Sequence, residues 1–225
     1  MNTAALENHD RALVVLGGVQ GFGALQQDCA AGLIDLRAYE TVICADSGQE
    51  VAGALGLTPQ TIIGDFDSSP RPTGTKSAVI ELPSEKDMTD SEAAVDLAYA
   101  RGFRLIDVLG GFGGRLDHSL GNLGIMAKYL QMGARVRFSD GYNLAWMQAP
   151  GVHQVSRHRY PFFGLVAFGG DVTGLTLEGF KYSLEDFTLV EATTLGVSNE
   201  FLADTATVSF RSGLLIFIHS RDVSA

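Results

Sequence analysis

Strand-like and helix-like segments alternate along the chain as far as about residue 140. Short apolar runs that end in Gly, Asp or Ser are typical of buried strands, and they occur at 11–16, 41–44, 61–63, 77–82, 105–109 and 134–138. Apolar positions spaced as on a helix lie between these runs, at 24–34, 48–55, 89–101 and 117–132. This alternation predicts a parallel sheet with helices packed on it.

The pattern changes after Asp140-Gly141. Short β-rich runs separated by Gly and Asn/Asp turns then follow, at 144–148, 164–168, 187–191, 205–209 and 214–219. Such runs are typical of a β-sandwich. We therefore predict an N-terminal parallel-sheet α/β domain over residues 11–141 and a C-terminal all-β sandwich domain over residues 142–220.

The net charge of the chain argues against nucleic-acid binding. It is −10, whereas nucleic-acid binding depends on basic surface. No run approaches the ~20 apolar residues of a membrane span, and the first ten residues lack the apolar core of a signal peptide. Cys29 and Cys44 both have apolar neighbours, as buried free thiols of the reducing cytosol do. We expect a cytoplasmic protein that binds neither nucleic acid nor membranes.

Two carboxylates, Asp65 and Asp67, follow the third predicted strand directly, in the segment Gly64-Asp65-Phe66-Asp67-Ser68. Ionised Asp is rarely buried unless it is paired or bound to metal, and Mg²⁺ usually takes one or two carboxylates together with substrate phosphates. The alternative is an Asx turn, because Asp and Ser are turn residues.

Further acids and glycines follow other predicted strands, namely Asp46-Ser47-Gly48, the segment 86–90 and the segment 110–118. In open α/β sheets ligands bind beyond the carboxyl ends of the strands, so these clusters are predicted to converge. Lys86 is suited to counter phosphate charge, and Asp87 or Asp90 to bind Mg²⁺. Thr89 with Glu92 has the alternative interpretation of a capping box.

A glycine-rich loop, Gly110-Gly111-Phe112-Gly113-Gly114, lies between a predicted strand and a predicted helix. Its N–H groups, the helix N-terminus and Arg115 favour a phosphate site. Asp117, which begins the helix with His118, is either a ligand or an N-cap. Gly17-Gly18 is interpreted as a plain turn. P-loop, protein-kinase and C-x-x-C motifs are missing from the sequence.

The predicted β domain contains a polar patch, Gly196-Val197-Ser198-Asn199-Glu200. On the residues alone this patch is interpreted as a turn between strands. Trp146 is interpreted as a core residue, with stacking on an aromatic cation as the alternative.

Taken together, these motifs resemble those of thiamin pyrophosphokinases. The resemblance runs from about residue 12 to residue 219 and rests on motifs in the same order: Ala45-Asp46-Ser47-Gly48, Gly64-Asp65-Phe66-Asp67-Ser68, Lys86-Asp87-x-Thr89-Asp90, Gly113-Gly114-Arg115-Leu116-Asp117-His118, Gly179-Phe180-Lys181-Tyr182 and Gly196-Val197-Ser198-Asn199-Glu200. Ser47 is a departure, because many members have Gly there.

The resemblance implies an ATP-binding catalytic α/β domain, a thiamin-binding β-sandwich, and a homodimer with thiamin near the subunit interface. It implies Mg²⁺-dependent transfer of pyrophosphate from ATP to thiamin, which yields thiamin diphosphate and AMP. Asp65, Asp67 and Asp90 are then expected to bind Mg²⁺, with Asp46 or Asp87 assisting. The residues expected to bind ATP are Lys86, Thr89, Gly111, Gly113, Gly114, Arg115, Asp117 and His118.

Ser198 and Asn199 are expected to hydrogen-bond to the aminopyrimidine ring of thiamin. Two other functions stay open from the sequence. A Mg²⁺-dependent nucleotide hydrolase would use the same acids and glycines, and a thiamin- or nucleotide-binding protein would have no activity.

Overall fold

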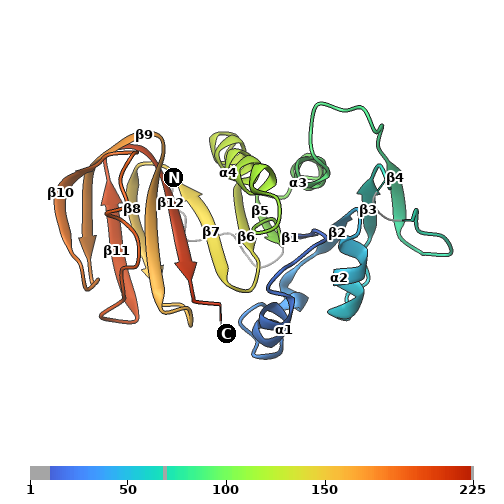
Figure 1. Cartoon of the computed structure of the whole chain (residues 1–225), viewed down its shortest axis with the longest axis horizontal. Coiled ribbons are helices and arrows are strands. Elements are labelled where there is room, and N and C mark those ends of the chain that lie inside the picture. Colours follow the sequence, from blue (N-terminus) through green and yellow to red (C-terminus); the bar gives the residue numbers. More distant parts are fainter. Residues whose placement is uncertain (1–10, 68–69, 224–225) are drawn as a thin grey trace. The chain divides into compact units, whose positions relative to one another are not determined.

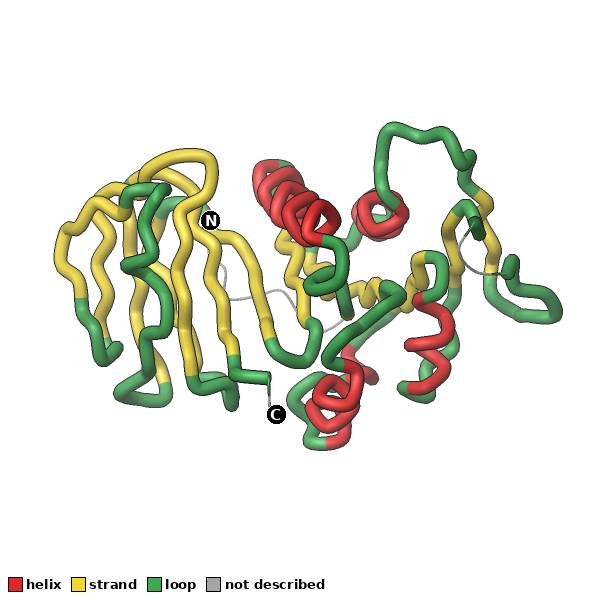
Figure 2. The backbone as a smooth tube through the Cα atoms, viewed as in Figure 1, coloured by secondary structure: helices red, strands yellow, loops and turns green. Residues whose placement is uncertain are grey.

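The structure is a computed structural model that describes residues 11–67 and 70–223, so Ser68 of the predicted acidic motif lies outside the described residues (Figure 1). The chain divides into two compact units between Gly141 and Tyr142. The predicted fold class is confirmed. The first unit combines a parallel sheet with helices, and the second is built of antiparallel strands (Figure 2).

The first unit contains six parallel strands in the order β4-β3-β2-β1-β5-β6. They are β1 (Arg11–Val15), β2 (Thr41–Ala45), β3 (Thr61–Gly64), β4 (Ala78–Glu81), β5 (Leu105–Leu109) and β6 (Arg135–Ser139). The helices are α1 (Phe22–Ala30), a 3-10 turn (Leu36–Ala38), α2 (Gly48–Ala54), α3 (Asp90–Ala100) and α4 (Leu116–Gln131). Helices α1 and α2 cover one face of the sheet, and α3 and α4 cover the other (Figures 1 and 2).

The central strands are apolar along their length because both faces of the sheet are covered. Leu13 and Val15 of β1 are fully buried and pack with Leu25 of α1 and Ala52 of α2. Strand β4, at the edge of the sheet, is partly exposed. The sheet and its helices therefore fix the chain segments that leave the strand ends.

The predicted bounds of helices α1 and α4 differ from the observed ones. Helix α1 was predicted to reach Ile34 but ends at Ala30, because Gly32 takes a left-handed conformation with φ 72°. Ile34 is apolar because it packs against the core beneath α1 and α2. Helix α4 begins at Leu116 with Arg115 as its N-cap, so the alternative that Asp117 is the N-cap is also wrong.

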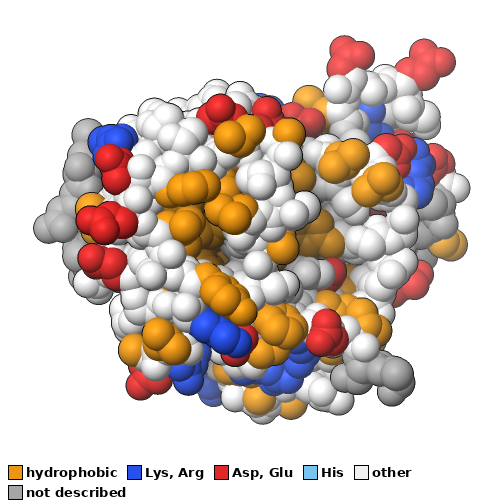
Figure 3. Space-filling model, turned by 60° about the vertical axis from the view of Figure 1, so that its left-hand side comes forward, with side chains coloured by type: hydrophobic (Ala, Val, Ile, Leu, Met, Phe, Trp, Pro, Cys, Tyr) orange, Lys and Arg blue, Asp and Glu red, His pale blue; other side chains and the backbone are white. Residues whose placement is uncertain are grey.

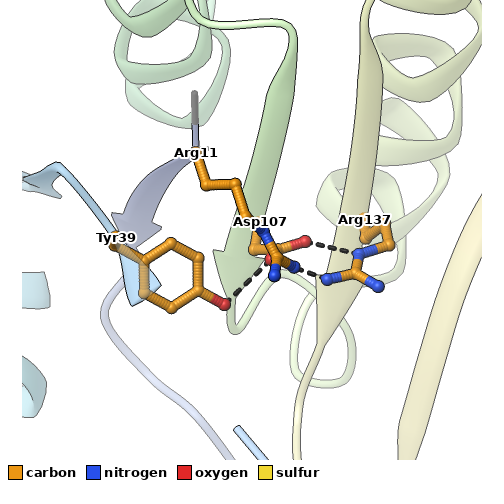
Figure 4. Close-up of polar contacts among 4 residues, drawn as sticks. All are labelled: Arg11, Tyr39, Asp107 and Arg137. Carbon is orange, nitrogen blue, oxygen red and sulfur yellow. Dashed lines mark hydrogen bonds and ion pairs between the residues drawn. The ribbon is translucent and has the colours of Figure 1, made fainter. Parts of the chain in front are cut away.

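A cluster of charged groups lies on the face of the sheet that carries α1 and α2 (Figure 4). The Asp107 carboxylate on β5 accepts hydrogen bonds from Arg137 at 2.5 and 2.7 Å, from Arg11 at 2.9 Å and from Tyr39 Oη at 2.8 Å. Burial alone raises the pKa of the Asp107 carboxyl, but Arg137 and the other partners outweigh burial and hold that pKa below its usual range. The carboxylate is therefore the centre of an ion network.

The second unit contains antiparallel strands in the order β7-β12-β9-β11-β8, and β10 pairs with β9. They are β7 (Asn143–Gln148), β8 (Gly151–Ser156), β9 (Phe162–Glu178), β10 (Leu184–Leu189), β11 (Thr205–Phe210) and β12 (Ser212–Ser220). The first half of β9 pairs with β12, and the second half pairs with β10 and β11. The long strand thereby joins two groups of strands around one apolar core.

Three features of this unit differ from the sequence prediction. Strand β8 was not predicted, and β9 extends ten residues beyond the predicted 164–168 at its C-terminal end. Strand β10 ends at Leu189, whereas the predicted run began at Phe187 and reached Glu191. Trp146 is buried against Phe217 and His219, so its interpretation as a core residue is confirmed.

Apolar side chains also reach the surface of the molecule. Figure 3 shows hydrophobic groups in patches among acidic and basic ones. In the second unit Tyr182, Leu195 and Val197 are each at least half exposed. No helix among the described residues is long and apolar enough to cross a membrane.

Candidate functional site

A pocket of about 370 Å³ opens at the carboxyl ends of the strands in the first unit. After β1 the chain enters α1 on one face of the sheet, whereas after β5 it enters α4 on the other face (Figure 1). The two neighbouring strands thus form the switch point at which open α/β sheets bind ligands. The lining residues include Gly17, Gly18, Asp46, Ser47, Thr89, Asp90, Gly111, Gly113, Gly114, Arg115, His118 and Asn122.

Three carboxylates meet beside this pocket. One oxygen each of Asp46, Asp65 and Asp67 lies within 4.8 Å of the others. Asp46 and Phe66 have positive φ angles of 51° and 56°, which are uncommon for residues other than Gly and are found at functional sites. The chain therefore accepts local backbone strain at the two turns that direct these carboxylates.

The predicted Asx turn and the predicted carboxylate pair are both present. The backbone N–H of Asp67 donates to Asp65 Oδ1 at 3.3 Å, as in an Asx turn. The same turn exposes the Asp67 carboxylate beside Asp46. The turn interpretation therefore explains the local backbone but leaves the grouping of three acids to be explained by function.

Lys86 and Asp90 extend the carboxylate group. The Lys86 ammonium pairs with Asp65 and lies 3.2 Å from Asp90 Oδ1. The hydrogen bond from Lys86 holds the pKa of the Asp65 carboxyl below its usual range, whereas burial raises the pKa of Asp90. Asp87, by contrast, is exposed and does not line the pocket as far as the chain is described. Asp90 is thus joined to the group through Lys86.

The glycine-rich loop after β5 has a conformation that few side chains permit. Gly110, Gly111, Gly113 and Gly114 all have positive φ angles. A Cβ atom on Gly111 would come within 2.6 Å of the Phe138 ring. Asn122 of α4 is buried, and its Nδ2 donates to Gly111 O at 2.7 Å. The loop is therefore held against the N-terminus of α4, where backbone N–H groups favour an anion.

Arg115 and Asp117 form a local pair at the mouth of the pocket. The guanidinium donates to both carboxylate oxygens, at 3.1 and 2.6 Å, and this contact lowers the pKa of Asp117. Both side chains are mostly exposed. His118 lines the pocket, and its backbone N–H donates to Asp117 Oδ1 at 2.9 Å. Arg115 therefore lies at the pocket with its fork turned towards Asp117.

Half of the predicted capping box at the start of α3 is confirmed, namely the N-cap role of Thr89. The Thr89 hydroxyl accepts a hydrogen bond from Glu92 N at 3.2 Å. The Glu92 carboxylate pairs with Lys128 of α4 at 2.9 Å. Thr89 also lines the pocket, so its capping role does not exclude the predicted contact with a ligand.

Several pocket residues were not identified from the sequence. Gly17 and Gly18 were interpreted as a plain turn, but they line the pocket. A Cβ atom on Gly17 would lie 1.9 Å from Ser47 Oγ, so the turn after β1 needs Gly to pass Ser47. Asn122 was also missed, although a polar residue among Ile125, Met126 and other buried residues of α4 is a usable signal.

A second pocket, of about 310 Å³, lies in the second unit. Its lining residues are Leu165, Leu175, Leu177, Tyr182, Leu184, Leu195, Gly196, Val197 and Asn199. Apolar walls with one buried amide suit a small aromatic ligand. Ser198 is exposed and has a positive φ of 58°. The pocket thus brings the predicted polar patch together with apolar strand residues.

The Asn199 side chain is largely occupied by the protein itself. Its Oδ1 accepts from Tyr182 N at 3.0 Å and from Glu200 N at 2.9 Å, and its Nδ2 donates to Tyr182 O at 2.8 Å. One N–H of the amide is left for a ligand. Asn199 therefore shapes the pocket wall as well as lining it.

We expect Asn199→Ala to lower the stability of the protein and, if the pocket takes thiamin as the resemblance implies, to raise the KM for thiamin at least several-fold. The substitution leaves partly buried backbone groups of residues 182 and 200 without their partners, at about 1–3 kcal/mol. Thermal unfolding and thiamin kinetics measure the two effects. Ser198→Ala is the matched variant, because its exposed side chain allows a kinetic effect without a loss of stability. If Asn199→Ala is as stable as the wild type, the Asn199 side chain does not hold the backbone of residues 182 and 200 in place.

Comparison with known proteins matches both units to one family. A family model described as the catalytic domain of thiamin pyrophosphokinase matches residues 36–138, and one described as its vitamin B1 binding domain matches residues 152–215. The thiamine pyrophosphokinase of Bacillus subtilis (strain 168) is 33% identical over 186 residues, which are 80% of this chain and 87% of the relative.

Solved structures give the same result. The thiamin pyrophosphokinase of Geobacillus thermodenitrificans is 31% identical with a TM-score of 0.79, over 95% of this chain and 99% of that one. A thiamin pyrophosphokinase family protein from Enterococcus faecalis is 29% identical with a TM-score of 0.82, over 95% of this chain and all (100%) of that one. The likeness therefore extends over both units.

Proposed function

Since the chain belongs to the thiamin pyrophosphokinase family, whose members form thiamin diphosphate, we propose that it transfers the pyrophosphate group of ATP to the hydroxyl of thiamin and releases AMP. One observation carries the details of this proposal. The pocket at the switch point is bordered by a glycine-rich loop and a helix N-terminus, and Asp46 of the three-carboxylate group also lines it. Elements suited to binding phosphate and a metal ion therefore lie at one pocket, and this supports the proposal.

In the proposed reaction the thiamin hydroxyl attacks the β-phosphorus of ATP. A new oxygen–phosphorus bond forms, and the bond from the β-phosphorus to the oxygen that bridges to the α-phosphorus breaks. AMP leaves with that oxygen, and the hydroxyl proton passes to a carboxylate of the acidic group. The protein forms no covalent bond, so its contribution is positioning and charge stabilisation.

The donor set fits Mg²⁺. Asp46, Asp65 and Asp67 offer hard carboxylate oxygens that lie close enough together to share one ion. Mg²⁺ bound there would neutralise phosphate charge and polarise the phosphoryl group. Asp90 completes the acidic lining, and we retain Asp87 as an assisting acid on the strength of its motif alone. Through the bound ion these carboxylates would hold the reacting phosphates in place.

The remaining contacts to ATP and thiamin follow from the two pockets. Backbone N–H groups of the 111–114 loop would bind the triphosphate, with Arg115, Thr89, Asp117 and His118 at its border. The apolar pocket of the second unit, with Ser198 and Asn199 at its edge, would hold the thiamin rings. We also propose a homodimer, because apolar Tyr182, Leu195 and Val197 are exposed around that pocket. Light scattering tests the dimer.

One assay distinguishes the proposed function from its two rivals. The protein is incubated with ATP, Mg²⁺ and either thiamin or no acceptor, and AMP and thiamin diphosphate are quantified. We expect AMP to form in equal amount to thiamin diphosphate and only when thiamin is present. Equal ATP cleavage without thiamin would indicate a nucleotide hydrolase. Binding of thiamin or ATP without any AMP would indicate a binding protein.

Arg115→Lys is expected to raise the KM for ATP, or lower kcat, by about tenfold, which corresponds to ~1.4 kcal/mol. A guanidinium can turn from Asp117 to grip two phosphate oxygens, whereas an ammonium offers a single point charge. Steady-state kinetics at varied ATP measures the effect. Arg37→Lys is the matched control, because Arg37 also pairs with an exposed Asp two residues away. If Arg115→Lys and Arg37→Lys have the same KM for ATP and the same kcat, Arg115 does not belong to the ATP site.

A further inference from the structure

Lys86 lies among the carboxylates rather than in the pocket. Its side chain is only 14% exposed, and its ammonium contacts Asp65 Oδ2 and Asp90 Oδ1. Asp46 and Asp90 line the pocket, but Lys86 is not among the described residues that do. This position differs from the one expected for a lysine that grips the triphosphate, because its charge is already directed at two acids.

Asp65 is shared between two cationic positions. With Asp46 and Asp67 it forms the group of three oxygens that can hold one metal ion. With Asp90 it also flanks the Lys86 ammonium. A lysine ammonium flanked by two carboxylates keeps its ordinary positive charge at neutral pH. A fixed positive charge therefore lies beside the metal group.

The Lys86 ammonium changes how much positive charge the four carboxylates need from metal ions. The carboxylates of Asp46, Asp65, Asp67 and Asp90 carry a charge of −4, and one divalent ion with one ammonium supplies +3. Without the ammonium, −2 would remain after the first ion, which is the charge that a second divalent ion neutralises. Enzymes that transfer phosphoryl groups often hold two such ions about 3.5–4 Å apart.

We propose that the Lys86 ammonium takes the place of a second divalent cation, so that the acidic group binds only one metal ion. The proposal rests on the metal site of the proposed function. It makes Lys86 a positioning residue that holds Asp65 and Asp90 in place. The ion held by Asp46, Asp65 and Asp67 is then the single ion that the protein itself supplies to the reaction.

Titration of the metal-free protein with Mn²⁺, followed by electron paramagnetic resonance without nucleotide, tests the proposal. We expect one bound Mn²⁺ per chain for the wild type and two for Lys86→Met, a neutral side chain of similar length. Lys86→Arg, which keeps the charge, should bind one. Lys128→Met is the matched control, because it also removes an ammonium from a carboxylate, that of Glu92, and it should bind one.

Thermal unfolding of the same proteins gives a second readout that does not depend on activity. Metal-free Lys86→Met should unfold at a lower temperature than the wild type, because Asp65 and Asp90 lose their counter-charge. Saturating Mn²⁺ should raise its Tm more than that of the wild type, because two bound ions stabilise the folded state. Lys86→Gln provides the same test if the Met variant does not fold.

Three outcomes would overturn the proposal in distinguishable ways. A single Mn²⁺ of wild-type affinity in Lys86→Met means that the ammonium does not occupy a cation position. Loss of all binding in that variant means that Lys86 shapes the first site instead. No binding by the wild type removes the metal site itself, and the proposed function then fails at that point rather than at Lys86.

Discussion

Asp67→Asn is expected to lower kcat by about a hundredfold or more while the protein keeps its fold. The Asp67 carboxylate is exposed and belongs to the three-carboxylate group, so it has no packing role to lose. Asn keeps the shape of the side chain but lacks the charge that a hard cation requires. Metal-ion catalysis is worth several kcal/mol, and about 1.4 kcal/mol corresponds to a factor of ten in rate.

The measurement is the rate of thiamin diphosphate formation at saturating Mg²⁺, together with thermal unfolding. Glu40→Gln is the control, because it also neutralises an exposed carboxylate of the first unit, away from the pocket. Activity of Asp67→Asn within a few-fold of wild type would remove Asp67 from the metal site. A large fall in Tm would instead favour the turn interpretation of this segment.

The strands of the first unit were predictable because burial on both faces of the sheet makes their apolar runs continuous. Its helices were predictable because their apolar positions are spaced as on a helix. Strand β5 was predicted at its exact bounds, and the whole β1–β6 alternation followed from the same signal. Helix α1 was overextended because Ile34 is apolar and partly buried against the core, yet the left-handed Gly32 ends the helix before it. Periodicity reports burial, and it does not report the backbone conformation that interrupts it.

The second unit was harder to predict because its strands are partly exposed. Strand β8 alternates between partly exposed, exposed and buried residues and includes His153 and Gln154, so its apolar signal is weak. The part of β9 beyond the predicted 164–168 contains Gly169, Gly170 and Gly174, all with positive φ, and they resemble turn residues in the sequence. A strand that bends between two groups of strands contains glycine at the bend, because glycine adopts positive φ angles without a steric cost.

The acidic group was partly predictable from the sequence. The rule that ligands bind at the carboxyl ends of parallel strands placed Asp46, Asp65 and Asp67 on one edge of the sheet. The contact of Lys86 with Asp65 was not predictable, because a lysine near phosphate-binding motifs is more simply assigned to phosphate. The bracing of the Tyr182 backbone by Asn199 was missed for a similar reason. A side chain's partner depends on tertiary geometry that spacing alone does not contain.

Asp107→Asn is expected to destabilise the protein by about 3 kcal/mol. The Asp107 carboxylate is the counter-charge of Arg11 and Arg137, and it also accepts the Tyr39 hydroxyl (Figure 4). Removing one partner of a buried ion pair costs about 3–5 kcal/mol, because the remaining charge is uncompensated. The two guanidinium groups are 25% and 31% exposed, so some water reaches them and the lower end of this range applies.

Urea unfolding near pH 7 measures the loss, and Glu81→Gln is the control. Glu81 pairs with Arg71 on the exposed edge strand β4, where breaking an ion pair costs less than about 1 kcal/mol. Asp107 is not among the described residues that line the pocket, so Asp107→Asn should leave the KM for ATP unchanged at temperatures where the variant is folded.

The direction of the Asp107 pKa shift determines how the stability difference between the wild type and Asp107→Asn changes with pH. The folded protein holds the pKa of Asp107 below its unfolded value, so the unfolded chain binds the proton more readily. The stabilisation is therefore complete above the unfolded pKa of about 3.9 and is lost as the pH falls through the lower folded pKa. The difference in stability between the wild type and Asp107→Asn should accordingly be constant from pH 7 to about pH 5 and shrink below about pH 4. A difference that grows on acidification, or one below about 1 kcal/mol at pH 7, would mean that solvent rather than Asp107 neutralises Arg11 and Arg137.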